Sequence, residues 1–192
     1  GLLQSDDTVV MVEALNNLGI VIKRSGERTI VHGCGGTFPN NAANLFLGNA
    51  GTAVRTLVPV LALMKGQYEL SGIPRMHERP VGDLVESLMS IGANISYLGQ
   101  ENYLPLRVGE SDQTNLSAPI QIRGDISSQF LTGLLLALPL TGQKVSIVVS
   151  GVLVSKPYVQ ITMDLMRSFG VEVVNQDWKE FHIDGSQGYR SP

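Results

Sequence analysis

Two stretches of the chain share one pattern of apolar and polar positions. Residues 48–72 and residues 124–151 each run from a glycine through small and hydroxyl residues into a long apolar segment, and then through Gly-Gln and an alternating segment to Ser-Gly. The long apolar segment predicts a buried helix, and the alternation of apolar and polar residues predicts a strand that is buried on one face. The chain therefore contains an internal repeat.

The repeat continues downstream of both stretches. Residues 79–95 match residues 156–173, because each has a proline near the first helical turn, spaced apolar residues, a glycine that ends the helix, and then a strand. A third copy of this second half spans residues 6–22, and its Gly19 corresponds to Gly92 and Gly170. The sequence thus holds two and a half units.

Each complete unit predicts a strand, a helix, a second strand, a second helix and a hairpin. The segments "SGERTIVHG" and "ENYLPLRVG" supply closing strands. A fold built from such units places equivalent helices around one axis, and the half unit at the start lacks its first helix. We therefore expect the natural domain to begin upstream of residue 1, since one buried helix otherwise lacks a partner. The alternative is that a domain of two and a half units is complete.

Composition narrows the class of protein. The chain has 192 residues, of which 43% are hydrophobic, and a net charge of -3 with 14 Lys and Arg and no basic run. This balance argues against a nucleic-acid partner and against binding to an anionic membrane surface. The apolar stretch 131–140 is too short to span a bilayer, the start lacks the pattern of a signal peptide, and Cys34 is the only cysteine. We expect a cytoplasmic protein, in the cytosol or an organelle interior.

Candidate chemistry lies at the starts of the predicted helices. The first amides of a helix have no partner within the helix and lie at the positive end of its dipole, so a start rich in Gly, Ser and Thr suits an anion. In the first unit this start holds Gly51 and Thr52, with Arg55 one turn further on; in the second unit Ser127 and Ser128 take the same place.

The second helix of the later unit begins in the same way, with Ser155 and Lys156 before Pro157. If the units are related by rotation, the helix starts meet on one face and place several hydroxyls, Arg79 and Lys156 around one cavity. This arrangement favours a phosphorylated substrate. The alternative is that the serines only cap their helices and the glycines only form tight turns.

Other kinds of site find little support. The glycine stretch has neither the Gly-Lys-Ser/Thr ending of a Walker loop nor the G-x-G-x-x-G of a dinucleotide fold. Three histidines and Cys34 are too few and too scattered for a zinc site, and no base is evident for a nucleophilic Cys34. We expect no metal and no organic cofactor.

The motifs "LFLGNAGTAVR", "PRMHERPVGDL", "GDISSQFLTGLL" and "LVSKPY" together resemble the EPSP (5-enolpyruvylshikimate-3-phosphate) synthase family. The resemblance runs from about residue 5 to residue 192. It implies an α/β fold, an inside-out barrel of βαβαββ units typical of enolpyruvyl transferases, here with the first unit incomplete. It also implies transfer of the enolpyruvyl group of phosphoenolpyruvate to the 5-hydroxyl of shikimate-3-phosphate, with expulsion of phosphate and without a cofactor.

The resemblance also assigns residues to the two substrates. It implies that Ser127, Ser128 and Ser155 hold the phosphate of shikimate-3-phosphate, with Gln129 against the ring and Tyr158 hydrogen-bonding nearby.

For phosphoenolpyruvate the resemblance implies contacts with Arg79 and with the backbone of Gly51, together with Asn49. The planar guanidinium of arginine suits a carboxylate or phosphate, because it can donate two parallel hydrogen bonds.

The chain departs from the family pattern in two respects. The family's "PGSKS" segment and its whole second domain are absent, so we expect residues 1–192 to form one shikimate-3-phosphate-binding domain that is inactive alone and has the missing domain as partner. In addition, Thr56 stands where the family has proline after the arginine. Loss of this proline restores a backbone N–H and shifts Gly51 and Thr52. The resemblance then implies reduced sensitivity to glyphosate, which competes with phosphoenolpyruvate.

Two alternatives stay open. One is a relative of UDP-N-acetylglucosamine enolpyruvyl transferase, a family that has a reactive cysteine five positions before this arginine, where the present chain has Pro74. The other is a non-catalytic anion-binding fragment or one half of a split enzyme.

Overall fold

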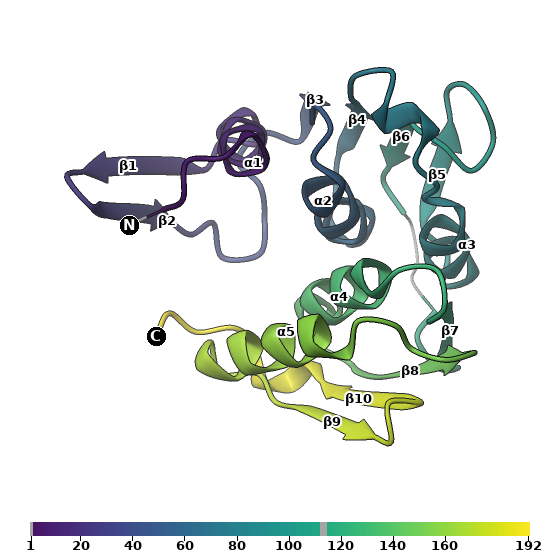
Figure 1. Cartoon of the computed structure of the whole chain (residues 1–192). Coiled ribbons are helices and arrows are strands. Elements are labelled where there is room, and N and C mark those ends of the chain that lie inside the picture. Colours follow the sequence, from purple (N-terminus) through teal and green to yellow (C-terminus); the bar gives the residue numbers. More distant parts are fainter. Residues whose placement is uncertain (1, 112–114) are drawn as a thin grey trace.

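The computed structural model describes residues 2–111 and 115–192, and two complete units of equal topology make up most of it (Figure 1). The first contains β3 (Ala42–Phe46), α2 (Gly51–Leu63), β4 (Gln67–Ser71), α3 (Gly82–Ser90), β5 (Asn94–Tyr97) and β6 (Leu106–Gly109). The second contains β7 (Ile120–Arg123), α4 (Ser128–Ala137), β8 (Lys144–Ser150), α5 (Lys156–Ser168), β9 (Val173–Gln176) and β10 (Glu180–Asp184). The predicted order of elements is confirmed in both units.

The two four-stranded sheets have the same order and the same strand directions. Their orders are β3-β4-β6-β5 and β7-β8-β10-β9. In each sheet the first two strands are parallel, the last strand of the unit (β6 or β10) pairs antiparallel with the second strand, and the other hairpin strand (β5 or β9) pairs antiparallel with the last. The parallel pairs join strands on either side of a helix, as the βαβ arrangement requires. The repeat read from the sequence is therefore a repeat of the fold.

The half unit consists of α1 (Asp6–Asn17) and a separate two-stranded sheet of β1 (Val21–Ser25) and β2 (Arg28–His32). Ser5 caps α1 by accepting a hydrogen bond from the Thr8 amide. In Figure 1 this hairpin extends to the left of α1, away from the two large sheets. The predicted half unit, a helix followed by a hairpin, is confirmed.

The helices α2 and α4 lie at the centre of the molecule, between the two sheets (Figure 1). Most residues of α2 and of α4 are buried, and this explains why neither helix has a wide polar face. A Cβ added to Gly133 would lie 2.1 Å from the carbonyl oxygen of Arg55. Pro59 lies four residues after Arg55 and has no N–H, so this oxygen lacks its usual hydrogen bond within α2. Because Gly133 has no side chain, α4 can approach α2 closely at this point.

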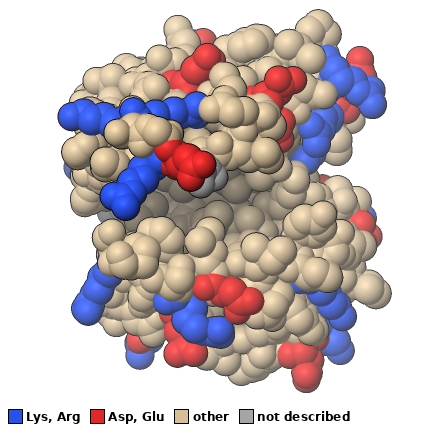
Figure 2. Space-filling view, turned by 60° about the vertical axis from the view of Figure 1, so that its left-hand side comes forward, with Lys and Arg blue, Asp and Glu red and all other residues tan. Residues whose placement is uncertain are grey.

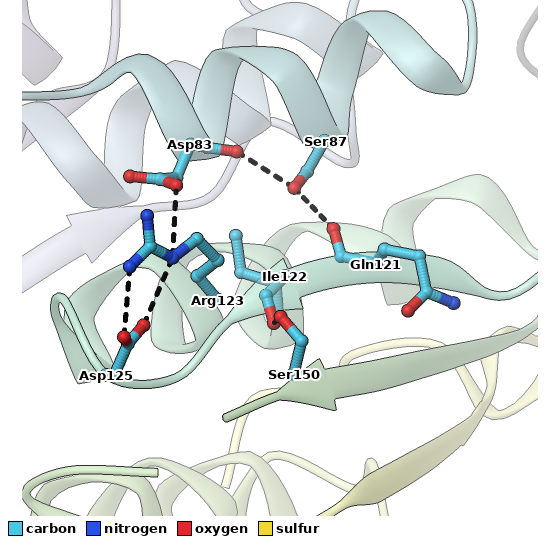
Figure 3. Close-up of polar contacts among 7 residues, drawn as sticks. All are labelled: Asp83, Ser87, Gln121, Ile122, Arg123, Asp125 and Ser150. Carbon is cyan, nitrogen blue, oxygen red and sulfur yellow. Dashed lines mark hydrogen bonds and ion pairs between the residues drawn. The ribbon is translucent and has the colours of Figure 1, made fainter. Parts of the chain in front are cut away.

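The second helix of a unit packs against the first strand of the next. Helix α1 lies on β3, and α3 lies on β7. At the second junction the Ser87 hydroxyl lies 2.6 Å from the carbonyl oxygen of Gln121, while Arg123 pairs with Asp125 and approaches Asp83 (Figure 3). Helix α5 instead exposes an apolar row that consists of Tyr158, Ile161 and Leu165.

Surface charge is scattered. On the face shown in Figure 2, Lys and Arg side chains alternate with Asp and Glu and form no continuous basic band, and the surface is hollowed between an upper and a lower part. A groove of about 380 Å³ lies between α1, the β1-β2 hairpin and the start of α2, lined mostly by apolar side chains such as Met11, Leu15 and Val31. Among the described residues, no helix has the length and apolarity that crossing a bilayer demands.

Candidate functional site

Arg79 lies directly over the amino end of α2. It follows a short 3-10 helix (Met76–Glu78), and its Nη1 donates a hydrogen bond of 2.9 Å to the carbonyl oxygen of Asn49. A Cβ on Gly51 would lie 2.3 Å from Nη2 of Arg79, closer than any real contact. Gly51 therefore permits the guanidinium to sit on the first turn of the helix, and the three residues assigned to phosphoenolpyruvate lie in contact.

A second arginine links the two central helices. Arg55 on α2 donates from Nη1 to Oε1 of Gln129 on α4 at 2.7 Å, and from Nη2 to the carbonyl oxygen of Pro80 at 3.2 Å. Gln129 in turn donates from Nε2 to the hydroxyl of Thr52 at 3.0 Å. These bonds join Gln129 to the residues around Arg79, which come from the other unit.

Arg55 is unusual because its charge is buried. Arg55 is 6% exposed, its guanidinium carbon lies 5.3 Å from the ring centroid of Phe130, and its Nε has no hydrogen-bond partner among the residues that the structure describes. Burial, and to a smaller extent the positive charge of Arg79, lowers the pKa of Arg55 to about 10. The group therefore remains protonated at neutral pH.

The two guanidinium groups leave this region with an excess of positive charge. Among the residues that the structure describes, no carboxylate lies within ion-pair distance of Arg55 or Arg79. The amino end of α2 adds its partial positive charge at the same place. Uncompensated positive charge on a half-buried surface favours an anionic ligand.

The paired serines lie at the start of α4. Ser127 is the N-cap, and its hydroxyl accepts a hydrogen bond of 3.2 Å from the Gln129 amide. Ser128 is the first helical residue and is 6% exposed. Both α2 and α4 begin at the same distance along the chain from the preceding strand, so Gly51 corresponds to Ser128 and Thr52 to Gln129. The predicted place of Ser127 and Ser128, at the start of the first helix of the second unit, is confirmed.

Ser155 lies at the start of α5 in a conformation uncommon for a residue with a side chain. Its φ is 55°, in the left-handed region, and its hydroxyl makes no capping hydrogen bond. The loop before α5 runs beside the loop before α4, because the Val154 amide donates to the Gly124 carbonyl at 3.0 Å and the Gly124 amide donates to Ser150 at 2.9 Å. The backbone thus places the two serine-containing starts next to each other.

Tyr158 and Lys156, both on the first turn of α5, have different surroundings. Tyr158 is 69% exposed, and within the described parts of the chain neither its side chain nor that of Ser155 is hydrogen-bonded to the group around Arg79. The ammonium of Lys156 lies 5.8 Å from the ring centroid of Trp178, a cation–π contact. The sequence predicts Lys156 around the same cavity as the serines. Its ammonium group instead lies over the Trp178 ring, which belongs to the turn between β9 and β10.

Arg55 and Thr52 are visible in the sequence at the start of α2 but are not among the predicted binding residues. The available signal was a single charge within an apolar helix, since a buried arginine normally has a partner. Cys34, which was weighed as a nucleophile, is half-buried and packs against the core. Within the described ranges, no group of three His, Cys, Asp or Glu residues is placed to hold a metal.

A separate cavity of about 510 Å³ lies between α3 and β7. Its walls include Asp83, Ser87, Gln121 and Arg123, and the polar groups drawn in Figure 3 largely satisfy one another there. None of the residues assigned to the two substrates lines it.

Comparison with known proteins identifies the family. Two curated relatives, both named 3-phosphoshikimate 1-carboxyvinyltransferase, come from Cupriavidus necator and Neisseria meningitidis serogroup B and are 50% and 54% identical to the chain. Each alignment covers 100% of this chain and 44% of the relative, so the chain spans less than half the length of these proteins.

A solved structure of EPSP synthase from Acinetobacter baumannii shares the fold. Its TM-score is 0.77 at 22% sequence identity, and the match covers 95% of this chain and 40% of that one. The family model for EPSP synthase (3-phosphoshikimate 1-carboxyvinyltransferase) matches residues 1–191. By that match over almost its whole length, the chain belongs to the EPSP synthase family.

Proposed function

We propose that this chain forms the shikimate-3-phosphate side of an EPSP synthase, which transfers the enolpyruvyl group of phosphoenolpyruvate to the 5-hydroxyl of shikimate-3-phosphate. The observation that carries the proposal is the contact between the two units at their helix starts. There Arg55 and Arg79 bring unpaired positive charge to the start of α2, and Gln129 connects it with the serines of α4.

The phosphate of shikimate-3-phosphate is assigned to Ser127, Ser128 and Ser155. Support comes from the adjacent loops before α4 and α5 and from the Ser155 hydroxyl, which makes no capping hydrogen bond within the described residues. A phosphate at these helix starts gains from the dipoles of both helices. Gln129 is assigned to the ring, and Tyr158, which is exposed on the first turn of α5, is assigned a hydrogen bond nearby.

Phosphoenolpyruvate is assigned to Arg79, the backbone of Gly51 and Asn49. The Arg79 guanidinium uses one N–H on the Asn49 carbonyl, and its remaining donors can form a two-bond contact with a carboxylate or phosphate. Because Gly51 lacks a side chain, an anion can approach the helix start from the same direction.

Activity requires groups that these residues do not supply. The site described here holds donors and positive charge but no carboxylate paired with a histidine or lysine that could exchange protons with the reacting atoms. We propose that the chain works together with the rest of the enzyme, as its 44% share of the relatives' length suggests, and that alone it binds substrate weakly and does not turn it over.

Titration of the chain with shikimate-3-phosphate tests the proposal. Saturable binding should be weakened by Ser127→Ala and by Ser155→Ala, each by roughly tenfold, as expected for loss of a hydrogen bond to a charged group. Ser168→Ala is the matched control, since Ser168 lies at the other end of α5 and its hydroxyl bonds only to the Leu165 carbonyl. Absence of saturable binding would favour a non-catalytic scaffold, and tighter binding of UDP-N-acetylglucosamine would favour the related transferase.

A further inference from the structure

Arg55 has a position that no ion pair within the described residues explains. It is a protonated side chain in the core, with an unpartnered Nε and no ion pair within the described residues. An apolar residue of similar size would avoid the desolvation of this charge. Besides the Phe130 ring, its guanidinium contacts two acceptors, the Gln129 side chain and the Pro80 carbonyl, and these two contacts point to a role.

The contact with Gln129 fixes the orientation of an amide. Arginine has only donors, so the atom of Gln129 that faces Nη1 at 2.7 Å must be its oxygen. The NH₂ group then points the other way, and one of its two N–H bonds is donated to the Thr52 hydroxyl. The second N–H has no acceptor among the described residues and is available to a ligand. Arg55 thus makes Gln129 a hydrogen-bond donor toward whatever binds beside it.

Without Arg55 the opposite orientation would become available. A hydroxyl can both donate and accept, so Thr52 could equally donate to the oxygen of a flipped Gln129 amide. The flipped amide would present a different set of atoms to the ligand. No other described side chain hydrogen-bonds to the Gln129 amide besides those of Arg55 and Thr52, so the orientation depends on the arginine.

Through its contact with Pro80, Arg55 also holds the segment that carries Arg79, the residue assigned to phosphoenolpyruvate. The Pro80 carbonyl follows Arg79 directly along the chain and accepts from Nη2 of Arg55. One guanidinium therefore ties the segment that carries Arg79 to the residue that faces the shikimate ring.

We propose that Arg55 is a positioning residue that holds the Gln129 amide in its donor orientation toward shikimate-3-phosphate and anchors the Arg79–Pro80 segment beside it. This inference rests on the proposed function for the identity of the ligand. The orientation of Gln129 is a property of the chain without ligand and can be measured independently.

The first experiment needs no substrate. Hydrogen exchange of the Gln129 side-chain NH₂ is followed by NMR in the full chain and in Arg55→Met, which replaces the guanidinium by an apolar side chain. We expect exchange to be at least several-fold faster in the variant, because the amide is no longer held from its oxygen side. Arg55→Lys, which keeps the charge but cannot span both acceptors, should lie between the two. Equal exchange rates in all three proteins would overturn the proposal.

The second experiment is a double-mutant cycle on shikimate-3-phosphate binding. We expect Arg55→Met and Gln129→Leu each to weaken binding by about tenfold, and the double variant to be no weaker than either, because Arg55 acts through Gln129. Independent effects that multiply to about a hundredfold would contradict this role.

Gln129→Glu supplies the matched control for the cycle. It keeps an acceptor for Arg55 and so should leave the thermal midpoint unchanged or higher, but it removes the second N–H and should lose the affinity. Retained affinity in Gln129→Glu would overturn the donor assignment. If the unmodified chain does not bind shikimate-3-phosphate at all, the proposed function fails, and the NH₂ exchange experiment alone decides the role of Arg55.

Discussion

The two complete units have one backbone plan but different chemistry at their helix starts. In both, the residue after the first strand donates its amide to the last residue of the second strand, Leu47 to Ser71 and Gly124 to Ser150. Helix α2 then begins at Gly51 and has no side-chain cap, whereas α4 begins behind the Ser127 cap. The repeat sets where the helix starts lie, and a few residues give each start its own polar groups.

The same comparison explains why the site lies between units. Thr52 and Gln129 are equivalent positions of the two helices, and they are hydrogen-bonded to each other. Equivalent residues meet in this way when two similar units pack their first helices side by side. Substitutions that change one unit while leaving its counterpart intact therefore test the division of roles.

The largest effect is expected from Gly51→Ala. The new methyl group would meet the Arg79 guanidinium, a flexible side-chain end that can move away, so the fold should persist while the anion contact is displaced. In the complete enzyme we expect kcat/KM for phosphoenolpyruvate to fall about 100-fold, the cost of misplacing a binding group by about an ångström.

Gly33→Ala is the control, because a Cβ there meets nothing within 4 Å and its backbone is not in the left-handed region. Unchanged kinetics for Gly51→Ala would contradict the assignment of Arg79 and Gly51 to the substrate site. An equal loss of shikimate-3-phosphate binding and of phosphoenolpyruvate binding would contradict the idea that each unit binds one of the two substrates.

Gly133→Ala should force the central helices of the two units, α2 and α4, apart. Its Cβ would lie 2.1 Å from the Arg55 carbonyl, a backbone atom that cannot swing aside, so α2 and α4 must move apart. We expect a loss of about 2 to 3 kcal/mol in the free energy of unfolding, measured by urea titration. Gly99→Ala, with its nearest neighbour at 3.5 Å, should change stability far less. Equal stabilities would show that the helices do not pack as closely as described.

Ser127→Ala tests the cap of α4 against the uncapped start of α2. Loss of the hydrogen bond to the Gln129 amide should lower the free energy of unfolding by about 1 kcal/mol, measured by thermal or urea unfolding. The variant should also bind shikimate-3-phosphate less tightly. A loss of stability without a loss of affinity would make Ser127 a structural cap alone.

Thr56→Pro is expected to have the smallest effect. The Thr56 hydroxyl donates to the Thr52 carbonyl at 2.8 Å, which is a local alternative to the helical ladder, and proline would remove both this bond and a backbone donor. The resulting shift of the α2 start should make the complete enzyme several-fold more sensitive to glyphosate. Equal inhibition of the two proteins would separate Thr56 from the phosphoenolpyruvate side.

Much of the fold could be predicted because it repeats. Local sequence is enough to predict the apolar helices α2 and α4 and the ends of α3 and α5 at Gly92 and Gly170. Because these signals occur twice in the same order, they also predict that the two units have the same topology. The positions where α2 and α4 start follow from the same local signals, and binding of an anion there stays a prediction.

The contacts between units could not be predicted from local patterns. The hydrogen bond from Arg55 to Gln129, the close approach of Gly133 to α2 and the placement of Lys156 over Trp178 each join residues far apart in the sequence. Such contacts depend on how two helices, or a helix and a hairpin, pack against each other. The pattern of apolar and polar residues along each element does not determine this packing. Arg55 was visible as an isolated charge, but its partner was not.

The most direct test of the account is a crystal structure of the chain, or of the enzyme that contains it, with shikimate-3-phosphate bound. We expect the phosphate to lie between the starts of α4 and α5, within hydrogen-bond distance of the Ser127 and Ser155 hydroxyls. The Gln129 NH₂ should face the ring. A phosphate bound elsewhere, or a Gln129 amide that turns its oxygen to the ligand, would contradict the account.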